Sequence, residues 1–352
     1  MPVRLKSGFV PSLLPSPDLV ALRGRRILIS GGTGFLGQSL LDYLVEAERT
    51  HLTGDLQVRV LSRDPLAFLA RAPRYRGHSW LQFVEWRLTA NERDLDVDGP
   101  FTDVVHAAAT THTASPTSAW VDAMYFGTKA MLEVARRHGA KRFLFLSSGA
   151  VYGPQPQDCP QLSETYSGAP SPQQTSSAYG QCKRMGEQLC SAYLHDFGIE
   201  TVSARLFALV SCYLPLNGPY ALGNFIRDAL YAEQILIKGD GRAVRTYIDG
   251  ADAAQWLFTL LSRGEAGTAY NVGSSLQALS IAELAVTVRD LVSPNKPIVS
   301  LANPLAGSDR SLYVPDTARA KSLGLVIRTP LQQAISAAAA AIAGARTLAP
   351  SH

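Results

Sequence analysis

Two kinds of apolar segment alternate along the chain up to about residue 207. Short continuous apolar runs are typical of buried parallel strands, and longer segments with apolar residues three and four positions apart predict helices that cover a sheet. The expected strands are 25–30, 57–61, 81–85, 101–109, 142–147 and 200–207, and the expected helices are one from residue 37 to about 48, 120–138 and 176–197. This alternation predicts an α/β fold with a doubly wound parallel sheet.

The alternation loosens beyond residue 207, where prolines interrupt the chain. Short strands are expected near 235–237 and 269–272, helices near 223–231 and 281–291, and a packed terminal helix in the alanine-rich run 334–345. We therefore expect three parts: an irregular lead-in at 1–24, the doubly wound domain at 25–207, and a smaller mixed α/β domain at 208–348, with some return of the chain to the first sheet.

The first expected strand runs directly into a glycine-rich turn, G-G-T-G-F-L-G at 31–37. Gly31 permits the tight turn, Gly34 lets the backbone approach a pyrophosphate, and Gly37 lets the helix pack closely on the strand. A pyrophosphate would then lie against the N–H groups of the helix N-terminus. The turn predicts a dinucleotide site of the Rossmann type, with contacts from Gly31, Thr33, Gly34, Phe35, Leu36 and Gly37.

The end of the second strand bears on the choice of dinucleotide. An acidic residue there would bind the 2′-hydroxyl of NAD, whereas an arginine accommodates the 2′-phosphate of NADP. The strand ends in Ser62 and Arg63, which favours NADP. Asp64 follows directly and keeps NAD as an alternative, and Arg63 could equally be an exposed loop residue.

Small residues follow the fourth expected strand, at Ala107, Ala108 and Ala109. Their small side chains leave room for a cofactor that runs across the strand ends, so they are expected to contact it. His106 precedes them within the apolar run, and we expect it to be a hydrogen-bonded core residue rather than a catalyst.

Three residues form the main candidate for catalysis. Ser148 ends the fifth expected strand, and Tyr179 and Lys183 lie four residues apart on the following helix, so they share one face. A phenol titrates near pH 10, too high for proton transfer at neutral pH unless nearby positive charge favours the phenolate. Lys183 supplies such a charge and could also reach the nicotinamide ribose, while Ser148 would align the substrate oxygen with the phenol.

Composition narrows the classes of function. The chain of 352 residues has 33 basic and 29 acidic residues, a net charge of +4 and no basic block, so it offers no nucleic-acid surface, although a mild positive charge suits an anionic small substrate. Its four cysteines show no metal-ligand pairs and no disulfide framework, which predicts no metal site and a reduced, cytoplasmic protein. No stretch reaches the roughly 18 apolar residues of a membrane span.

Taken together, these motifs make the chain resemble an extended short-chain dehydrogenase/reductase of the nucleotide-sugar epimerase/dehydratase type, over about residues 24–330. The resemblance implies that Ser148, Tyr179 and Lys183 are the catalytic triad and that the substrate is a nucleotide sugar. It further implies that Arg245 binds the sugar-nucleotide diphosphate and that Asn224 and Arg310 contact substrate. It also implies that the protein is a homodimer whose interface is formed by helices 120–138 and 176–197. The motifs that carry it are G-G-T-G-F-L-G (31–37), D-V-V-H-A-A-A (103–109), S-S-G-A-V-Y-G (147–153), Y-G-Q-C-K (179–183), G-D-G-x-x-x-R-T-Y (239–247), Y-N-V-G (270–273) and Y-V-P-D (313–316).

The chain departs from this family pattern at several positions. Sugar 4,6-dehydratases usually carry an Asp-Glu pair directly after the catalytic hydroxyl, and here those positions are Gly149 and Ala150, so ordinary 4,6-dehydration is not expected. Arg87 stands where an aspartate often contacts adenine, and Ala208 replaces a frequent asparagine. The segment 210–213 (V-S-C-Y) replaces the usual V-x-G-P turn, which bears on how the nicotinamide is seated.

We therefore expect an NAD(P)-dependent oxidoreductase that acts on a nucleotide-linked sugar. We favour reduction of a nucleotide 4-keto-6-deoxyhexose, because Arg63 favours NADPH, the usual form of a consumed cofactor. A C4 epimerase with tightly bound NAD needs the same triad and is the close alternative. A decarboxylase, an atypical dehydratase and a non-catalytic cofactor-sensing regulator are further alternatives, and a pure sensor would not require the Tyr179–Lys183 pair.

Overall fold

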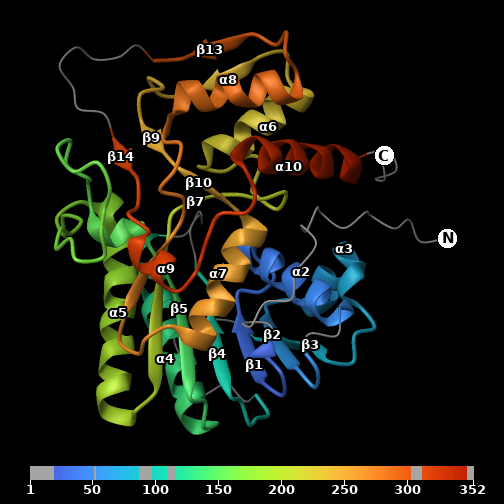
Figure 1. Cartoon of the computed structure of the whole chain (residues 1–352), viewed down its shortest axis with the longest axis vertical. Coiled ribbons are helices and arrows are strands. Elements are labelled where there is room, and N and C mark those ends of the chain that lie inside the picture. Colours follow the sequence, from blue (N-terminus) through green and yellow to red (C-terminus); the bar gives the residue numbers. More distant parts are fainter. Residues whose placement is uncertain (1–19, 51–52, 87–96, 110–115, 303–310, 347–352) are drawn as a thin grey trace.

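The structure is a computed structural model, and it describes residues 20–50, 53–86, 97–109, 116–302 and 311–346. Its main element is a seven-stranded sheet in which every neighbouring pair is parallel, with the order β11-β6-β5-β4-β1-β2-β3 (Figure 1). The strands are β1 (Arg26–Ser30), β2 (Gln57–Ser62), β3 (Leu81–Glu85), β4 (Asp103–His106), β5 (Arg142–Ser148), β6 (Glu200–Leu206) and β11 (Ala269–Val272). The predicted doubly wound sheet is confirmed.

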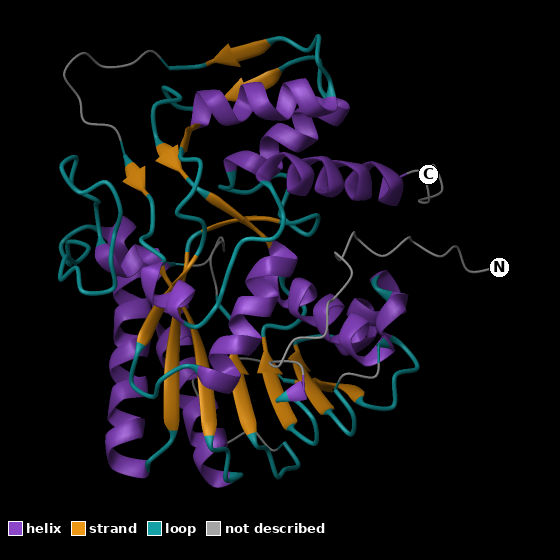
Figure 2. Ribbon diagram, in the orientation of Figure 1, coloured by secondary structure: helices purple, strands orange, loops and turns teal. Residues whose placement is uncertain are grey.

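Helices cover both faces of this sheet (Figures 1 and 2). The strands therefore bury both of their faces: Ile27 and Ile29 of β1 join one core, and Leu28 between them joins the other. This is why the strands have continuous apolar runs rather than alternating ones. One face carries α2 (Phe35–Arg49) and α7 (Gly250–Arg263), and the other carries α4 (Thr117–Arg137) and α5 (Ala178–Phe197); α3 (Pro65–Arg71) lies between β2 and β3 in the chain.

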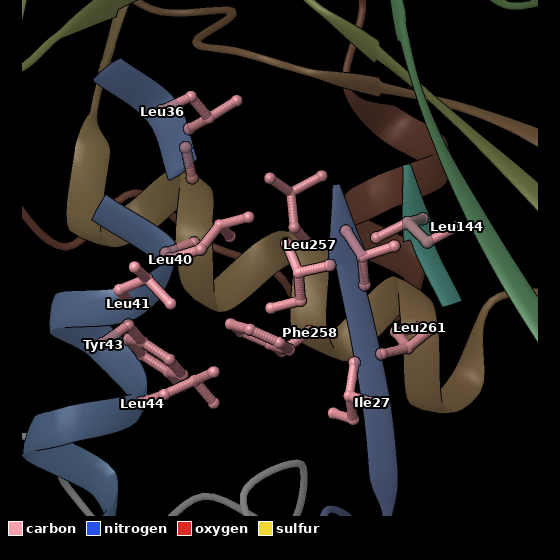
Figure 3. Close-up of a cluster of buried hydrophobic side chains, with 14 of the residues drawn as sticks. Ile27, Leu36, Leu40, Leu41, Tyr43, Leu44, Leu144, Leu257, Phe258 and Leu261 are labelled. Atoms are coloured by element: carbon pink, nitrogen blue, oxygen red, sulfur yellow. The ribbon is translucent and has the colours of Figure 1, made fainter. Parts of the chain in front are cut away.

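The core between α2, α7 and the sheet is shown in Figure 3. Leucines of α2 project toward α7 and β1, and the rings of Tyr43 and Phe258 stack with centroids 5.7 Å apart. Tyr43 and Phe258 are each at most 2% exposed. Burial of side chains of this size contributes about 1.5–3 kcal/mol each, so this layer holds the glycine turn at the start of α2 in a fixed place against the sheet.

A second, smaller part of the chain lies above the sheet in Figure 1, around its own apolar core. That core is made mainly by α6, α8 and α10, with Phe225, Leu284 and Ile335 among its buried residues. Its elements are β7 (Ala208–Val210), α6 (Ala221–Tyr231), β8 (Ile235–Ile237), β9 (Val244–Arg245), β10 (Tyr247–Asp249), β12 (Leu279–Ser280), α8 (Ile281–Val292), β13 (Ile298–Ser300), β14 (Leu312–Tyr313) and α10 (Leu331–Arg346). The short helix α9 (Ala318–Ser322) packs instead on β11 of the first sheet.

Most expected elements occur within one to three residues of their predicted bounds, with two informative differences. The fourth strand is only Asp103–His106, because the alanines that follow leave the sheet instead of extending it. The helix expected from 176 begins at Ala178, after a 3₁₀ turn at Thr175–Ser177. The chain returns to the first sheet at β11, which pairs with β6 as an edge strand.

Candidate active site

The glycine turn lies where β1 and β4 are neighbours, at the point where the order of strands reverses. Such switch points are where open α/β sheets bind ligands. Gly31 has a φ of +74°, and a Cβ on it would lie 2.4 Å from the backbone nitrogen of Ala108. A Cβ on Gly37 would lie 2.2 Å from the carbonyl oxygen of Gly31. The turn therefore packs backbone against backbone on two sides, as the spacing of the glycines predicts.

The N-terminus of α2 is suited to an anion. Gly34 is its N-cap and offers no side-chain acceptor, and the first turn has no acidic residue. The first N–H groups of a helix lack partners within the helix and carry partial positive charge. The turn therefore fits a dinucleotide pyrophosphate, which backbone groups of Gly34, Phe35 and Leu36 would bind. The Leu36 side chain itself packs into the core.

At the end of β2, Asp64 has a structural role as the N-cap of α3. Its carboxylate accepts a hydrogen bond from the Ala67 N–H at 2.8 Å and so caps α3. Ser62 is buried, and its hydroxyl accepts from the Asp64 N–H at 3.3 Å. Arg63 is exposed. This strand end therefore carries an exposed guanidinium, and one oxygen of the neighbouring carboxylate caps α3.

His106 is a buried residue with both ring nitrogens hydrogen-bonded. The Thr128 hydroxyl donates to the Met124 carbonyl at 2.8 Å, so it accepts from His106 Nε2–H at 3.1 Å. His106 Nδ1 then accepts from the Ser30 hydroxyl at 2.6 Å. Burial lowers the pKa of His106 to about 3, with a smaller effect from Lys183, so the ring is neutral and joins β1 to β4 and α4. The expectation of a core histidine is confirmed.

The alanines that follow β4 lie against the glycine turn. The Ala107 N–H donates to the Ser30 carbonyl at 3.0 Å, and Ala108 is the residue that a Gly31 side chain would strike. Ala107 and Ala108 are half-buried and Ala109 is exposed. No bulky side chain occupies these three positions, as a cofactor across the strand ends would require.

Ser148 ends β5 and is buried. Its hydroxyl accepts from the Ala150 N–H at 3.2 Å and so caps the 3₁₀ turn Gly149–Tyr152. The Tyr313 hydroxyl lies 3.4 Å away from it. A side chain at Gly149 would displace its neighbours, because a Cβ there would lie 2.7 Å from both the Phe207 ring and the Tyr313 hydroxyl. The position of the dehydratase aspartate is thus filled by two aromatic residues.

Tyr179 and Lys183 lie on the first turns of α5, on the face toward β5. Lys183 is 2% exposed, its ammonium donates to the Leu146 carbonyl at 2.7 Å, and it lies 5.9 Å from the centre of the Tyr179 ring. Burial lowers the pKa of Lys183 to about 8. The structure thus brings the three predicted catalytic residues together around the end of β5.

The expected lowering of the Tyr179 pKa is not present in the protein by itself. Burial raises the pKa of Tyr179, and the neighbouring Tyr313 and Tyr220 raise it further, while a hydrogen bond with Ser148 lowers it. The Lys183 ammonium donates to the Leu146 carbonyl and lies 5.9 Å from the centre of the Tyr179 ring, so burial has the larger effect on the Tyr179 pKa. The phenol is consequently protonated at neutral pH, which is the form needed to give a proton to a substrate oxygen. Sequence reasoning missed Tyr220 and Tyr313 here, because neither stands at a helical spacing from Tyr179.

The predicted substrate residues occupy the smaller part of the chain. Arg245 in β9 is half-buried, and its guanidinium donates to the carbonyls of Val244 (2.8 Å) and Ser311 (3.1 Å) and to the Ser311 hydroxyl (3.1 Å). Burial lowers its pKa, and no carboxylate of the described residues pairs with it. A partly buried cation in that state suits a bound anion. Asn224 is buried, donates to the Gly218 carbonyl at 2.9 Å, and has an amide oxygen without a partner among the described residues.

Some expectations fall outside the described residues or concern absences. Arg310 and Arg87 lie outside them. The described part of the chain has no group of three or more His, Cys, Asp or Glu residues placed to hold a metal ion. None of the described helices is both long and apolar enough to span a bilayer. All four cysteines are free thiols.

Comparison with known proteins is consistent with this geometry. UDP-glucuronic acid decarboxylase 1 of Xenopus tropicalis is 30% identical over 343 residues, which cover 94% of this chain and 75% of the relative. A dTDP-glucose 4,6-dehydratase from Streptomyces venezuelae, solved with NAD, has a TM-score of 0.76 at 21% identity, with 92% of this chain and 98% of the other covered. RMD from Pseudomonas aeruginosa, solved with NADPH, has a TM-score of 0.70 at 21% identity, with 91% and 99% covered.

The two solved structures establish the likeness of fold, and the decarboxylase extends the likeness to sequence. The model of the NAD-dependent epimerase/dehydratase family matches residues 27–273, which include the glycine turn, the triad and Arg245. The chain therefore belongs to the NAD-dependent epimerase/dehydratase family and is an enzyme of the extended short-chain dehydrogenase/reductase class.

Proposed function

We propose that this enzyme reduces a nucleotide-linked 4-keto-6-deoxyhexose at C4 with NADPH. The observation that carries the proposal is the state of Tyr179: burial keeps its phenol protonated beside Ser148, and no carboxyl group occupies the next position, Gly149. A ketone reductase needs a proton donor and a hydrogen-bond donor at one carbonyl oxygen. An elimination of water needs further proton-transfer groups, which Gly149 and Ala150 do not supply.

Five residues of the chain would bind the substrate and transfer the proton. Ser148 holds the substrate carbonyl by donating a hydrogen bond, and Tyr179 gives its proton to the same oxygen as the alkoxide forms. Lys183 places a positive charge behind Tyr179 and stabilises the phenolate left after proton transfer. Arg245 and Asn224 bind the nucleotide diphosphate and so position the sugar. NADPH would supply the hydride at the switch point.

Arg63 supports NADPH over NADH. Replacing it with serine is expected to weaken NADPH binding by roughly 10- to 100-fold and to change NADH binding little, because a charge-assisted contact to the 2′-phosphate is lost. Arg71→Ser is the matched control, since Arg71 is an exposed arginine at the end of α3. Fluorescence titration of both dinucleotides measures the effect. An equal loss for NADPH and NADH would contradict the role of Arg63.

A second candidate function uses a cofactor that is regenerated in each cycle. It is favoured by the similarity to UDP-glucuronic acid decarboxylases over most of the chain. A C4 epimerase with tightly bound NAD belongs to the same group, because it also oxidises and then reduces the sugar with one cofactor. Both use the same triad, and they differ from the reductase because NAD stays bound to the enzyme between cycles.

Denaturing the purified protein and chromatographing the released dinucleotide separates the two candidates. The reductase predicts a protein free of stoichiometric NAD that binds NADPH well above NADH. Near-stoichiometric NAD would contradict it and favour the epimerase or decarboxylase. Failure to release or bind either dinucleotide would contradict enzymatic function of this kind and leave a protein that has lost the activity of its family.

We also propose that the enzyme is a cytoplasmic homodimer joined through α4 and α5. The free thiols suit a reducing compartment, and the exposed side of α5 carries Met185 (48% exposed) and Phe197 (51% exposed). Exposed apolar residues are typical of an interface, and α4 packs beside α5. Sedimentation at micromolar concentration is expected to give twice the chain mass of 37.9 kDa, and a single monomeric mass would contradict the dimer.

A further inference from the structure

Tyr313 connects two parts of the site that are far apart in the sequence. It lies in β14, a strand of two residues that pairs in parallel with β9, and the register places Tyr313 opposite Arg245. Its side chain reaches the end of β5, where its hydroxyl lies 3.4 Å from that of Ser148. One residue thus touches both the predicted diphosphate ligand and the predicted catalytic serine.

The direction of the hydrogen bond to Ser148 follows from the other partner of Tyr313. The Tyr313 hydroxyl donates its only proton to the Leu206 carbonyl at 3.2 Å. With that proton given to Leu206, the Tyr313 hydroxyl accepts from Ser148, and the Ser148 hydroxyl is the donor between the two. A contact of 3.4 Å is long for two hydroxyl groups, so a substrate carbonyl can take over the Ser148 proton at little cost. Tyr313 thereby fixes the orientation of the Ser148 hydroxyl before substrate arrives.

The ring of Tyr313 is fixed by tight packing. Its centroid lies 4.5 Å from that of Phe207, and the missing side chain of Gly149 makes room for its hydroxyl. Burial raises the pKa of Tyr313 to about 12, so the hydroxyl stays protonated and keeps its bond to Leu206. A rigid, neutral phenol is suited to orient a neighbour, whereas it is unsuited to act as a base.

Arg245 is the second residue that Tyr313 contacts. Its guanidinium carbon lies 5.4 Å from the centre of the Tyr313 ring, and Ser311, two residues earlier in the same segment, accepts two of its hydrogen bonds. A guanidinium over an aromatic ring is attracted by the ring's negative face. Segment 311–313 therefore determines where the Arg245 charge lies.

We propose that Tyr313 is a positioning residue that couples substrate binding to catalysis: its hydroxyl orients Ser148, and its ring seats Arg245 against the substrate diphosphate. The effect on kcat can be measured only if the proposed function is right, so that part of the proposal rests on it. The effect on nucleoside diphosphate affinity is measured without any reaction. Two substitutions distinguish the role of the hydroxyl from the role of the ring. Tyr313→Phe removes only the hydroxyl, and Tyr313→Ala removes both.

The test compares these two variants for turnover and for binding of a nucleoside diphosphate. The probe is whichever of UDP, dTDP, GDP and CDP binds the wild-type enzyme most tightly by calorimetry. Tyr313→Phe is expected to lower kcat about tenfold and to leave the diphosphate Kd within about twofold of wild type. Tyr313→Ala is expected to show the same loss of kcat and also to weaken diphosphate binding about tenfold.

The matched control is Tyr152→Phe. Tyr152 is buried, packs on the same Phe207 ring at 6.4 Å, and donates to Asn271 Oδ1 at 2.8 Å, away from Ser148. It is expected to lower the thermal midpoint while kcat stays near wild type. This control shows whether a lower kcat comes from a less stable fold or from a misoriented Ser148 hydroxyl.

The outcomes against the proposal are specific. An unchanged kcat in Tyr313→Phe, or equal diphosphate affinities in Tyr313→Phe and Tyr313→Ala, would overturn it. If no nucleoside diphosphate bound the wild type, both this proposal and the proposed function would fall. If a diphosphate bound and no keto sugar was reduced, only the proposed function would fall, and the binding comparison would still decide whether Tyr313 seats Arg245.

Discussion

Tyr179→Phe is expected to lower turnover about a thousandfold while dinucleotide binding stays near wild type. The substitution removes one oxygen atom, the one that we propose gives a proton to the substrate. The protein holds that proton firmly, since burial and two neighbouring phenols raise the Tyr179 pKa. Because no carboxyl side chain stands at Gly149 or Ala150, the adjacent positions offer no substitute donor. Steady-state NADPH oxidation and a separate NADPH titration measure the two effects.

Tyr193→Phe is the matched control for this prediction. Tyr193 lies on the same helix, is 7% exposed, and donates its hydroxyl proton to Glu133 of α4 at 2.5 Å. Its loss is expected to affect stability and to leave turnover near wild type. If Tyr179→Phe retained more than about a tenth of wild-type turnover, Tyr179 would not be the proton donor.

Lys183→Met is expected to lower kcat by roughly 100- to 1,000-fold without destabilising the fold. The ammonium is 2% exposed and its pKa is lowered to about 8, so folding disfavours its charge. A buried apolar side chain of similar length relieves that cost and removes the charge that we propose stabilises the Tyr179 phenolate. Lys141→Met is the control, because Lys141 is an exposed lysine at the amino end of β5. Stopped-flow turnover and thermal unfolding report the two quantities.

The same pKa gives this prediction a pH dependence. Lys183 is protonated below pH 8 and loses its proton as the pH rises through about 8, so wild-type turnover is expected to fall on the alkaline side of that value. Between about 8 and 10.5 the unfolded chain binds this proton and the folded chain does not, so the contribution of Lys183 to stability rises with pH in that window. Lys183→Met should lack both effects. A wild-type rate that stays constant from pH 7 to 10 would contradict the role of the ammonium.

The sheet and the cofactor turn could be predicted from the sequence because each follows from a local pattern. Continuous apolar runs and the spacing of Gly31, Gly34 and Gly37 depend on neighbours within a few residues. The Tyr179–Lys183 pair is also local, since four residues on a helix share a face. Ser148 could be added because it ends a central strand.

The remaining features of the site depend on residues distant in the chain. Asp64 looks like a possible ribose ligand in the sequence, and only the start of α3 shows that it serves as a helix cap. Gly149 marks a missing acid in the sequence, and only the packing shows that Tyr313 and Phe207 fill its place. The Tyr179 pKa was expected to be lowered by Lys183, and burial, which no spacing reveals, has the larger effect in the protein itself.

The most direct test of the reductase is the fate of the hydride. NADPH carrying deuterium at the transferred position would be incubated with a nucleotide 4-keto-6-deoxyhexose, and the product sugar would be examined by mass spectrometry and NMR. The proposal predicts one deuterium at C4, one configuration at that carbon, and one NADPH oxidised for each sugar reduced. A product without deuterium, or conversion of a nucleotide sugar with no net oxidation of NADPH, would contradict it and point to an enzyme that regenerates its own cofactor.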